Sequence, residues 1–350
     1  MDYGIAVATT TESWKVVRRA EELGFNSAWF YDTQLLNPDL FMGMTMAAMH
    51  TSKIRLGTGV LIPSNRIEPV TANCLATLNK IAPGRIDFGV GTGFTGRRTM
   101  GLRPISLSRM REYIDRVQRL ILGETISWDF EEKTREIGFL NPEFGLINVN
   151  DRIPLHISAF GRRSRQMTVE LGAGWINFGT AEPSCILAVD KMKEAWEVQW
   201  GKEKALYSTL FTLGAVQSQD SPLSNKEIEQ AGPSVAVFFH DMVESSSSGT
   251  LEGSLGKPIS DLVEQYREIY MSYPEERRHL LNHKGHLMFL RPEERHLITP
   301  ELVKRMTFTG KRDVLRARAS HLEEAGYNQL VVQIVEGHED ALDEWASVFF

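Results

Sequence analysis

Short apolar runs alternate with segments of helical periodicity along the first half of the chain. The apolar runs, which predict buried strands, are Tyr3–Ala8, Ser27–Asp32, Ile54–Val60 and Arg85–Gly91. The segments with apolar residues three and four positions apart, which predict helices, are Glu12–Leu23, Pro38–His50, Pro69–Ile81 and Ser108–Leu122. Gly24 and Gly123 follow two of these segments, as is typical of helix C-termini.

The second half continues the alternation less regularly. Further strands are predicted at Pro154–Ala159, Gly174–Gly179, Leu206–Val216 and Gln329–Val335, and helices at Ser164–Leu171, around Met192–Trp200 and at Lys311–Ala325. Each predicted strand except the last is followed by helical sequence, which indicates a parallel sheet covered on both faces. Eight such units in 350 residues predict a (β/α)₈ barrel with insertions, and we expect residues 1–350 to form a single barrel domain.

Two stretches interrupt this rhythm. Residues 124–150 contain β-like pieces and prolines, and we interpret them as an excursion before the fifth strand. Residues 217–300 form a long mixed insertion, in which Ser245–Ser248 followed by Gly249 predicts a mobile loop. An insertion of this length in a compact barrel is usually a lid or a binding element.

Composition narrows the class of protein. The chain has 39 Lys and Arg against 45 Asp and Glu, a net charge of −6, which argues against nucleic-acid and anionic-membrane partners. The two cysteines, Cys74 and Cys185, are far apart, which excludes a disulfide framework and a cysteine-rich metal site. The first residues lack the features of a signal peptide, and no long apolar run is present, so we expect a cytoplasmic protein.

The residues that follow the predicted strands are the candidates for chemistry, because barrel enzymes place their sites at the C-terminal ends of strands. They are rich in glycine and hydroxyl groups and lack a nucleophile–base pair, which favours a cofactor cradle over a Ser-His-Asp triad. The predicted cofactor-binding residues are Asp32, Gly59, Val60, Thr92, Ser158, Phe160, Gly161, Arg162, Gly179 and Thr180.

An anion site is predicted after the fifth strand. Phe160–Ser164 combines a permissive glycine, two arginines and the start of a helix, features that suit a phosphate group. Gly179 and Thr180 after the sixth strand would add donors. The alternative is a helix cap with solvated arginines.

Gly91–Gly96 formally matches the G-x-G-x-x-G fingerprint of dinucleotide-binding proteins. The residues that follow do not begin an amphipathic helix, and the acidic residue at the expected spacing, Glu112, lies inside a predicted helix. A flexible turn beside a ligand is the better interpretation. Arg97, Arg98 and Arg103 form a basic cluster nearby, either a solvated loop or an anion contact.

The insertion carries His279, His283, His286 and His296. His279 and His283 share a helical face, but a third ligand would lie beyond Lys284 and Gly285, and no carboxylate motif completes a zinc site, so we expect no metal. Packing or surface roles are the alternative to a place in the pocket. We take His283 and His286 as candidate acid/base residues, because imidazole changes charge near neutral pH.

Several of these segments together resemble the bacterial-luciferase-like superfamily of flavin monooxygenases and deazaflavin-dependent oxidoreductases. The resemblance rests on the order and spacing of ELGFNSAWFYD, IRLGTGVLIPSNRIEPVTAN, GRIDFGVGTG, MREYIDRVQRLILGE, IPLHISAFGRRS, GAGWINFGT and the segment from Thr299 to Gln333. It implies a barrel with a flavin-type cofactor across its top and a non-prolyl cis peptide at Gly59–Val60 against the cofactor ring. It also implies that the phosphate lies over Phe160–Gly161 and Gly179–Thr180, with Asp32 near the ring.

The chain departs from the deazaflavin dehydrogenases of this superfamily at two positions. Thr33 stands where those proteins often carry histidine, and Phe94 stands where some carry an acidic residue. Both changes remove an acid/base group and argue against a sugar-phosphate dehydrogenase. With these acid/base groups absent, we expect an apolar pocket with aromatic walls. Its walls would be made by the following residues, for some of which the barrel core is the alternative: Trp29, Phe30, Phe94, Phe160 and Phe178.

The resemblance leads us to expect the first of the following three functions, and the other two are its alternatives. The first is a two-component monooxygenase that uses O₂ and reduced FMN, supplied by a partner flavin reductase, to oxidise a small organic substrate. The second is hydride transfer with coenzyme F420, whose acidic tail Arg97, Arg98 or Arg162 would hold. The third is a non-catalytic flavin-binding barrel. The family often dimerises through barrel helices, so we expect a homodimer, with an exposed apolar helix face as its sign.

Overall fold

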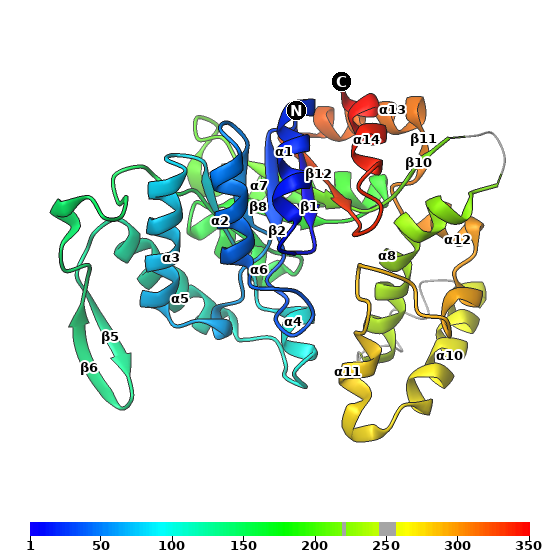
Figure 1. Cartoon of the computed structure of the whole chain (residues 1–350), viewed down its shortest axis with the longest axis horizontal. Coiled ribbons are helices and arrows are strands. Elements are labelled where there is room, and N and C mark those ends of the chain that lie inside the picture. Colours follow the sequence, from blue (N-terminus) through cyan, green and yellow to red (C-terminus); the bar gives the residue numbers. More distant parts are fainter. Residues whose placement is uncertain (219–221, 245–256) are drawn as a thin grey trace.

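Eight parallel strands form a closed barrel (Figure 1). The computed structural model describes residues 1–218, 222–244 and 257–350. The barrel order is β1-β12-β9-β8-β7-β4-β3-β2. The strands are β1 (Asp2–Val7), β2 (Ser27–Phe30), β3 (Arg55–Thr58), β4 (Ile86–Val90), β7 (Leu155–Ser158), β8 (Gly174–Phe178), β9 (Ser208–Thr212) and β12 (Gln329–Ile334). The predicted (β/α)₈ barrel is confirmed.

Helices cover the outside of the barrel. They are α1 (Ser13–Leu23), α2 (Leu40–His50), α3 (Glu68–Ile81), α5 (Leu107–Ile121), α6 (Arg162–Glu170), α7 (Glu182–Trp200), α13 (Arg312–Ala325) and α14 (Ala341–Phe349). The short helix α4 (Phe94–Arg98) lies in the loop after β4, at the C-terminal end of the barrel. Local signals set their ends. Helix α1 ends at Gly24, whose left-handed backbone (φ 101°) lets its N–H reach the carbonyls of Ala20 and Glu21. Helix α14 follows the last strand, where the sequence predicted no helix.

The barrel interior is closed by side chains from several strands. Trp29 packs with Ala6, Ile176, Phe211 and Val331, and its Nε1 donates hydrogen bonds to Ser27 Oγ and Gln329 Oε1. Trp29 and Phe30 are both essentially inaccessible to solvent. The prediction that Trp29 and Phe30 line the pocket is therefore wrong, and the alternative prediction that they form barrel core is confirmed.

Residues 124–150 contain a two-stranded antiparallel hairpin, β5 (Ile126–Phe130) and β6 (Lys133–Ile137), followed by a 3₁₀ turn at Pro142–Phe144. Figure 1 shows this hairpin projecting from the barrel at the left of the view. The predicted strand at Leu206–Val216 divides into β9 and a short strand β10 (Val216–Gln217), which pairs with β11 (Gly310–Lys311).

Residues 217–300 are mainly helical in the ranges described. The helices here are α8 (Asn225–Glu244), α10 (Lys257–Ser272) and α11 (Arg278–Asn282), and α12 (Pro300–Met306) follows. Short 3₁₀ turns occur at Glu275–Arg277 and Arg295–Leu297. Helices α8, α10 and α12 pack around their own apolar cluster, which includes Val235, Phe239, Val263 and Leu302. The loop predicted to be mobile at Ser245–Ser248 lies outside the described residues.

Helices long and apolar enough to cross a bilayer do not occur in the described ranges of the chain. The expected cytoplasmic location stays a prediction.

Candidate active site

A pocket of about 870 Å³ lies at the C-terminal ends of the barrel strands, a size typical of small-molecule sites. Strand ends and the α4 and α6 loops form most of its wall, and α8 and the turn after α11 contribute the rest. Eight of the predicted cofactor-binding residues line it: Asp32, Gly59, Val60, Thr92, Ser158, Phe160, Gly161 and Arg162. Their role in binding a cofactor stays a prediction.

Three predicted site residues are not brought to the pocket wall. Thr180 turns its hydroxyl to the carbonyl of Met306 (2.7 Å), and its own carbonyl accepts a hydrogen bond from Arg318 Nη2 (2.8 Å). Gly179 packs against Cys185, and a Cβ added at Gly179 would lie 2.7 Å from the Cys185 Sγ. His283 is buried, and its Nε2 lies 3.1 Å from Glu244 Oε2. The geometry therefore separates these residues from the other candidates, whereas His286 does line the pocket.

The peptide bond between Gly59 and Val60 is cis, as the resemblance predicted. Gly91 faces this segment from β4, and a Cβ on Gly91 would lie only 2.7 Å from Val60 Cγ2. Gly59 is similarly crowded, because a Cβ added at Gly59 would lie 2.9 Å from the Cβ of Trp29. Glycine at these positions lets the β3 loop reach the pocket floor without a clash.

Asp32 holds the β3 loop in place. Its carboxylate accepts hydrogen bonds from the Ile62 backbone N–H (3.0 Å), Asn65 Nδ2 (3.1 Å) and Arg66 Nη1 (3.0 Å). Burial raises the pKa of Asp32, and the Arg66 guanidinium opposes that rise. Because its oxygens already have protein donors, Asp32 acts on the shape of the pocket rather than as a free acid or base.

Helix α6 directs its N-terminus at the pocket. Gly161 is its N-cap and provides no side-chain acceptor, so the first-turn N–H groups are available to a ligand. Gly161, Arg162, Arg163 and Ser164 all line the pocket. Free N–H groups, the helix dipole and two guanidinium groups together suit a phosphate.

Three exposed phenylalanine side chains line the same pocket. Phe94, Phe160 and Phe178 are 45%, 57% and 41% exposed, values that are high for phenylalanine. The Arg98 guanidinium carbon lies 3.6 Å from the centroid of the Phe94 ring, a cation–π contact. These rings give a planar ligand an apolar surface while the arginines remain at the rim.

Titratable groups reach the pocket from the insertion. Asp241 on α8 lines the pocket and forms an ion pair with Arg98 (Oδ1 to Nη1, 2.8 Å). Burial raises the pKa of Asp241 to about 6 although Arg98 opposes this rise. His286 shares a hydrogen bond between its Nε2 and Thr95 Oγ1 (3.2 Å), and burial holds its pKa well below its usual value. Asp241 therefore titrates near neutral pH, and His286 is a neutral imidazole.

Sequence reasoning missed Asp241 and also His240, which lies beside His283 and His286. Both are on α8, which the sequence did not predict as a helix. The available signal was the spacing of Ile228, Ala231, Val235, Phe239 and Met242, but Gly232 and Pro233 interrupt it.

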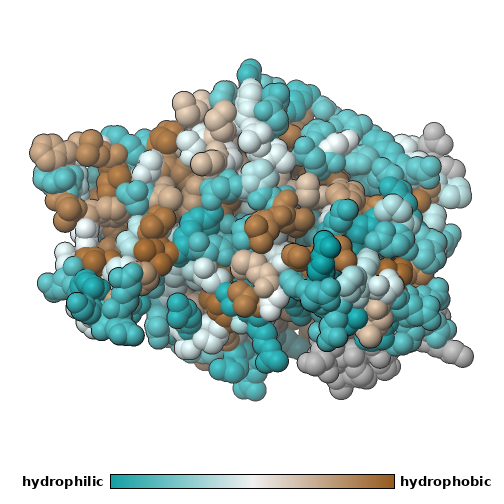
Figure 2. Space-filling view, turned by 60° about the horizontal axis from the view of Figure 1, so that its bottom comes forward, coloured by the Kyte–Doolittle hydropathy of each residue, from teal (hydrophilic) through white to brown (hydrophobic). Residues whose placement is uncertain are grey.

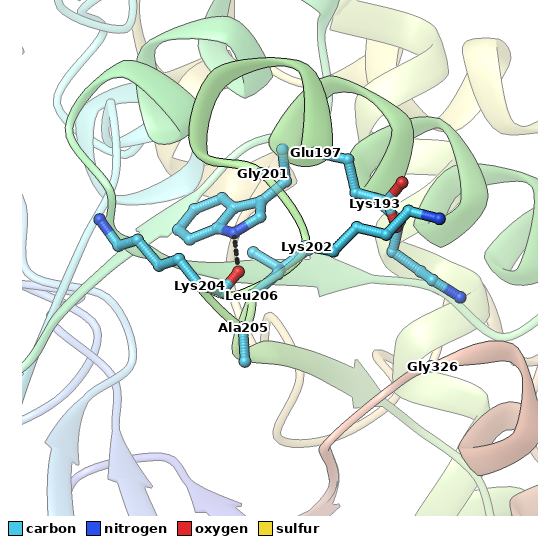
Figure 3. Close-up of a pocket in the computed structure, with 9 residues that line it drawn as sticks. Lys193, Glu197, Gly201, Lys202, Lys204, Ala205, Leu206 and Gly326 are labelled. Atoms are coloured by element: carbon cyan, nitrogen blue, oxygen red, sulfur yellow. Dashed lines mark hydrogen bonds between the residues drawn. The ribbon is translucent and has the colours of Figure 1, made fainter.

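A second, smaller hollow of about 160 Å³ lies beside α7 (Figure 3). It is lined by Lys193, Trp196, Lys204 and Gly326 among others, and Trp196 Nε1 donates a hydrogen bond to the Lys204 carbonyl (2.7 Å). These residues precede β9 and β12, so the hollow lies at the N-terminal end of the barrel. Barrel enzymes use the opposite end for chemistry, so the larger pocket is the candidate site.

Comparison with known proteins agrees with this arrangement. The family described as luciferase-like monooxygenase matches residues 4–211. The chain belongs to the luciferase-like monooxygenase family. The matched region contains every strand-end residue of the pocket up to Phe211 at β9, but not the insertion.

Curated relatives of this luciferase-like protein are reductases, dehydrogenases and monooxygenases. A 5,10-methylenetetrahydromethanopterin reductase of Archaeoglobus fulgidus is 27% identical, and the match covers 60% of this chain and 62% of that protein. An F420-dependent glucose-6-phosphate dehydrogenase of Microbacterium testaceum is 28% identical over 60% of this chain and 65% of that protein. A limonene 1,2-monooxygenase of Rhodococcus erythropolis is 25% identical over 53% of this chain and 48% of that protein. The chain thus spans less than two thirds of the length of these relatives.

Solved structures show the same fold. The coenzyme F420-dependent tetrahydromethanopterin reductase of Methanopyrus kandleri superposes with a TM-score of 0.70 at 20% identity, covering 99% of this chain and 97% of that one. The FMN complex of a Baeyer–Villiger monooxygenase from Pseudomonas putida superposes with a TM-score of 0.62 at 13% identity, covering 99% and 96%.

Proposed function

We propose that this luciferase-like protein is an oxidoreductase that uses coenzyme F420 to transfer a hydride to or from a small organic substrate. The observation that carries the proposal is the place of Asp241, a carboxyl group on the pocket wall whose Oδ1 lies 2.8 Å from Arg98 Nη1. Thr33 and Phe94 stand at the two strand ends where deazaflavin dehydrogenases carry acid/base groups. Asp241 on α8 brings an acid/base group to the pocket from the insertion instead. The F420-dependent relative from Microbacterium testaceum supports the same choice.

The pocket residues fit a flavin-type cofactor. Val60 on the β3 loop and the exposed phenylalanine rings offer apolar contacts to a planar ring, and the N-terminus of α6 offers donors to a phosphate. The Tyr31 hydroxyl at the pocket is buried without a hydrogen-bond partner among the residues described, which leaves a donor for a bound group. Arg98 is engaged by Asp241, so Arg162 and Arg163 are the better candidates to hold an acidic tail.

Asp241 supplies the proton chemistry in this proposal. The bound deazaflavin would provide the hydride acceptor or donor. At neutral pH Asp241 is mainly a carboxylate, because its pKa is about 6, and it accepts the hydroxyl proton of an alcohol substrate. The Arg98 guanidinium beside it holds the carboxylate in position. In the reverse direction the protonated Asp241 returns this proton to a carbonyl oxygen.

A second candidate is the two-component monooxygenase with reduced FMN. The apolar wall made by Phe94, Phe160 and Phe178 favours it, because oxygen chemistry on a reduced flavin requires shelter from water. The relative named limonene 1,2-monooxygenase supports it as well. This function requires a partner flavin reductase. A non-catalytic flavin-binding barrel would leave Asp241 without a role.

Equilibrium binding separates these functions. Purified protein is titrated with F420 and, separately, with oxidised and reduced FMN, and ligand fluorescence or absorbance is followed. The proposal predicts F420 binding at micromolar concentrations that weakens in Arg162→Ala. Binding of FMN alone would overturn it in favour of the monooxygenase. Binding of both without turnover of any substrate would favour the non-catalytic barrel.

We also propose a homodimer. Helix α2 exposes Met42, Met46 and Met49 on one face, and Val70 on α3 is exposed as well. The view in Figure 2 shows hydrophobic side chains grouped at several places, including the left end, where Figure 1 places the hairpin. Exposed apolar helix faces of this kind are typical of protein interfaces.

A further inference from the structure

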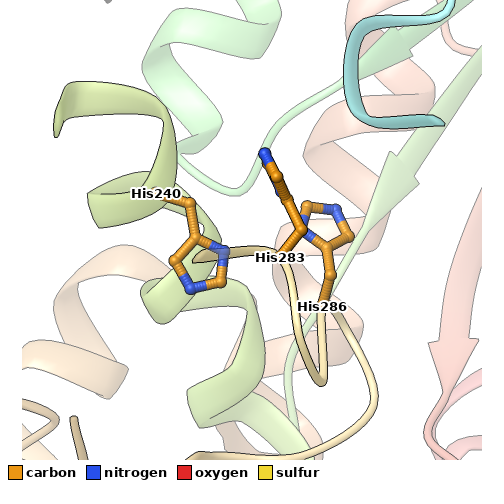
Figure 4. Close-up of side chains that lie close together, drawn as sticks. All are labelled: His240, His283 and His286. Atoms are coloured by element: carbon orange, nitrogen blue, oxygen red, sulfur yellow. The ribbon is translucent and has the colours of Figure 1, made fainter. Parts of the chain in front are cut away.

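Three histidines meet at the edge of the candidate active site (Figure 4). His240 lies on α8, His283 directly follows α11, and His286 lies in the next turn. One ring nitrogen from each lies within 4.8 Å of the others, and the ring centroids are 5.6 to 5.8 Å apart. The side chains are almost completely buried, with exposures of 1%, 1% and 6%. Buried imidazoles at this spacing need a physical explanation.

Each ring uses only one of its two nitrogens in hydrogen bonding. The Nε2 atoms of His240, His283 and His286 face Glu294 (3.4 Å), Glu244 (3.1 Å) and the Thr95 hydroxyl (3.2 Å). The three Nδ1 atoms are buried and have no hydrogen-bond partner in the described ranges of the chain. An unpaired buried polar atom costs about 1–3 kcal/mol relative to one exposed to water. Three such atoms in one cluster point to a missing common partner.

The carboxylates fix the ring tautomers. A carboxylate only accepts hydrogen bonds, so Nε2 of His283 carries a proton toward Glu244 and Nδ1 is left with a free lone pair. The same holds for His240 and Glu294. Arg291 Nη2 also lies 3.2 Å from His240 Nε2, but it donates to Glu294 Oε2 at 2.6 Å, so it does not need the imidazole as its acceptor.

Free Nδ1 lone pairs on His240 and His283, with a carboxylate behind each ring, match the donors of a metal site. The Thr95 hydroxyl can accept from His286 Nε2, which permits the same tautomer in the third ring. Metal-bound histidines commonly donate their second N–H to a carboxylate, which orients the ring and raises its basicity. The charged groups around the cluster are Asp241, Glu244 and Glu294 against Arg98 and Arg291, a balance that leaves one negative charge. This net negative charge around the three imidazoles favours a divalent cation between them.

We propose that His240, His283 and His286 bind one divalent metal ion through their Nδ1 atoms, with Zn²⁺ as the preferred ion. Zn–N bonds of 2.0–2.1 Å place ligand nitrogens about 3.3 Å apart, so the three imidazoles, which offer ring nitrogens within 4.8 Å of one another, would move closer together on binding. His286 also lines the large pocket, so the ion would lie at its wall and keep a fourth position for water or a substrate oxygen. The proposal does not depend on which cofactor the protein binds.

The test is direct metal binding by the full chain, without cofactor or substrate. Protein treated with a chelator is titrated with Co²⁺, whose visible absorption bands report tetrahedral coordination, and Zn²⁺ is then added as a competitor. We expect about one Co²⁺ per chain, displacement by Zn²⁺ and a higher melting temperature with either ion. A folded wild-type protein that shows neither bands nor a melting shift in excess metal would overturn the proposal.

Matched variants keep the test specific. In His283→Gln the side-chain amide keeps a donor for Glu244 and removes the Nδ1 ligand, and we expect a loss of affinity of more than about 100-fold. His296→Gln changes an exposed histidine outside the cluster and should bind like wild type. Equal binding by both variants would place the metal elsewhere on the protein and contradict the proposal. If His283→Gln does not fold, His240→Gln provides the same comparison.

Discussion

Single residues decide what the pocket does chemically. Asp32 and Asp241 are both carboxyl groups on its wall, but their surroundings differ. Asp32 accepts three hydrogen bonds from the β3 loop, so its oxygens are occupied. Asp241 has a single arginine partner and a pKa near 6. Environment therefore gives one carboxyl group a positioning role and leaves the other free for proton transfer.

The proton-transfer role of Asp241 predicts a pH profile. The carboxylate is the active form for alcohol oxidation, so kcat/KM of the metal-free protein should be constant above about pH 7 and fall about tenfold per pH unit below the pKa of about 6. Asp241→Asn should lower kcat/KM by about 10²–10⁴-fold and remove this inflection. Asp190→Asn, an exposed aspartate on α7, should retain both rate and profile. An unchanged profile in Asp241→Asn would assign the proton to another group.

The positioning role of Asp32 predicts a different result. Asp32→Asn weakens the ion pair with Arg66, which retains Asp39, so we expect a loss of folding stability of about 2–3 kcal/mol. Cofactor affinity should fall because the β3 loop loses its anchor, while the pH profile of the remaining activity should keep its inflection near 6. Denaturant unfolding and binding titrations measure these effects, and a shifted inflection would contradict the assignment.

At the scale of elements, apolar patterning predicted seven of the eight barrel strands to within about two residues at each end, while the strand predicted at Leu206–Val216 runs four residues past the end of β9. Strands buried on both faces have continuous apolar runs, which are visible without any tertiary information. The strand-end residues could be predicted for the same reason. The insertion helices could not, because Gly232 and Pro233 interrupt the apolar spacing of α8 and its burial depends on contacts with α10 and α12. Asp241 and His240 were missed together with their helix.

At the scale of the whole molecule, the pocket lies where the barrel and the insertion meet. The insertion has an apolar cluster of its own, separate from the main core, and contributes Asp241 and His286 to the pocket. The barrel contributes the strand-end residues that we propose bind a cofactor, and the insertion contributes Asp241 and His286. This division explains why a family match that ends at residue 211 identifies the fold while leaving the substrate open.

The exposed face of α2 predicts the assembly state. Met42 and Met49 are 74% and 68% exposed, so Met42→Glu combined with Met49→Glu should convert a dimer to a monomer without unfolding it. Val198→Glu on α7, at a residue that is 89% exposed, should leave the dimer intact. Sedimentation at micromolar concentration measures the mass. A wild-type monomer, or a double variant that still dimerises, would contradict the prediction.

Anaerobic reduction of F420 by alcohols is the most direct test of hydride transfer by this protein and of the role of Asp241. The protein, F420 and a panel of alcohols are mixed without oxygen, and the visible absorbance of the oxidised cofactor is followed in wild type and Asp241→Asn. We predict that wild type bleaches F420 with at least one alcohol and that the variant does so at least about 10²-fold more slowly. Bleaching by both proteins at the same rate would contradict the role of Asp241. Oxygen-dependent turnover with reduced FMN, and none with F420, would contradict the proposed function itself.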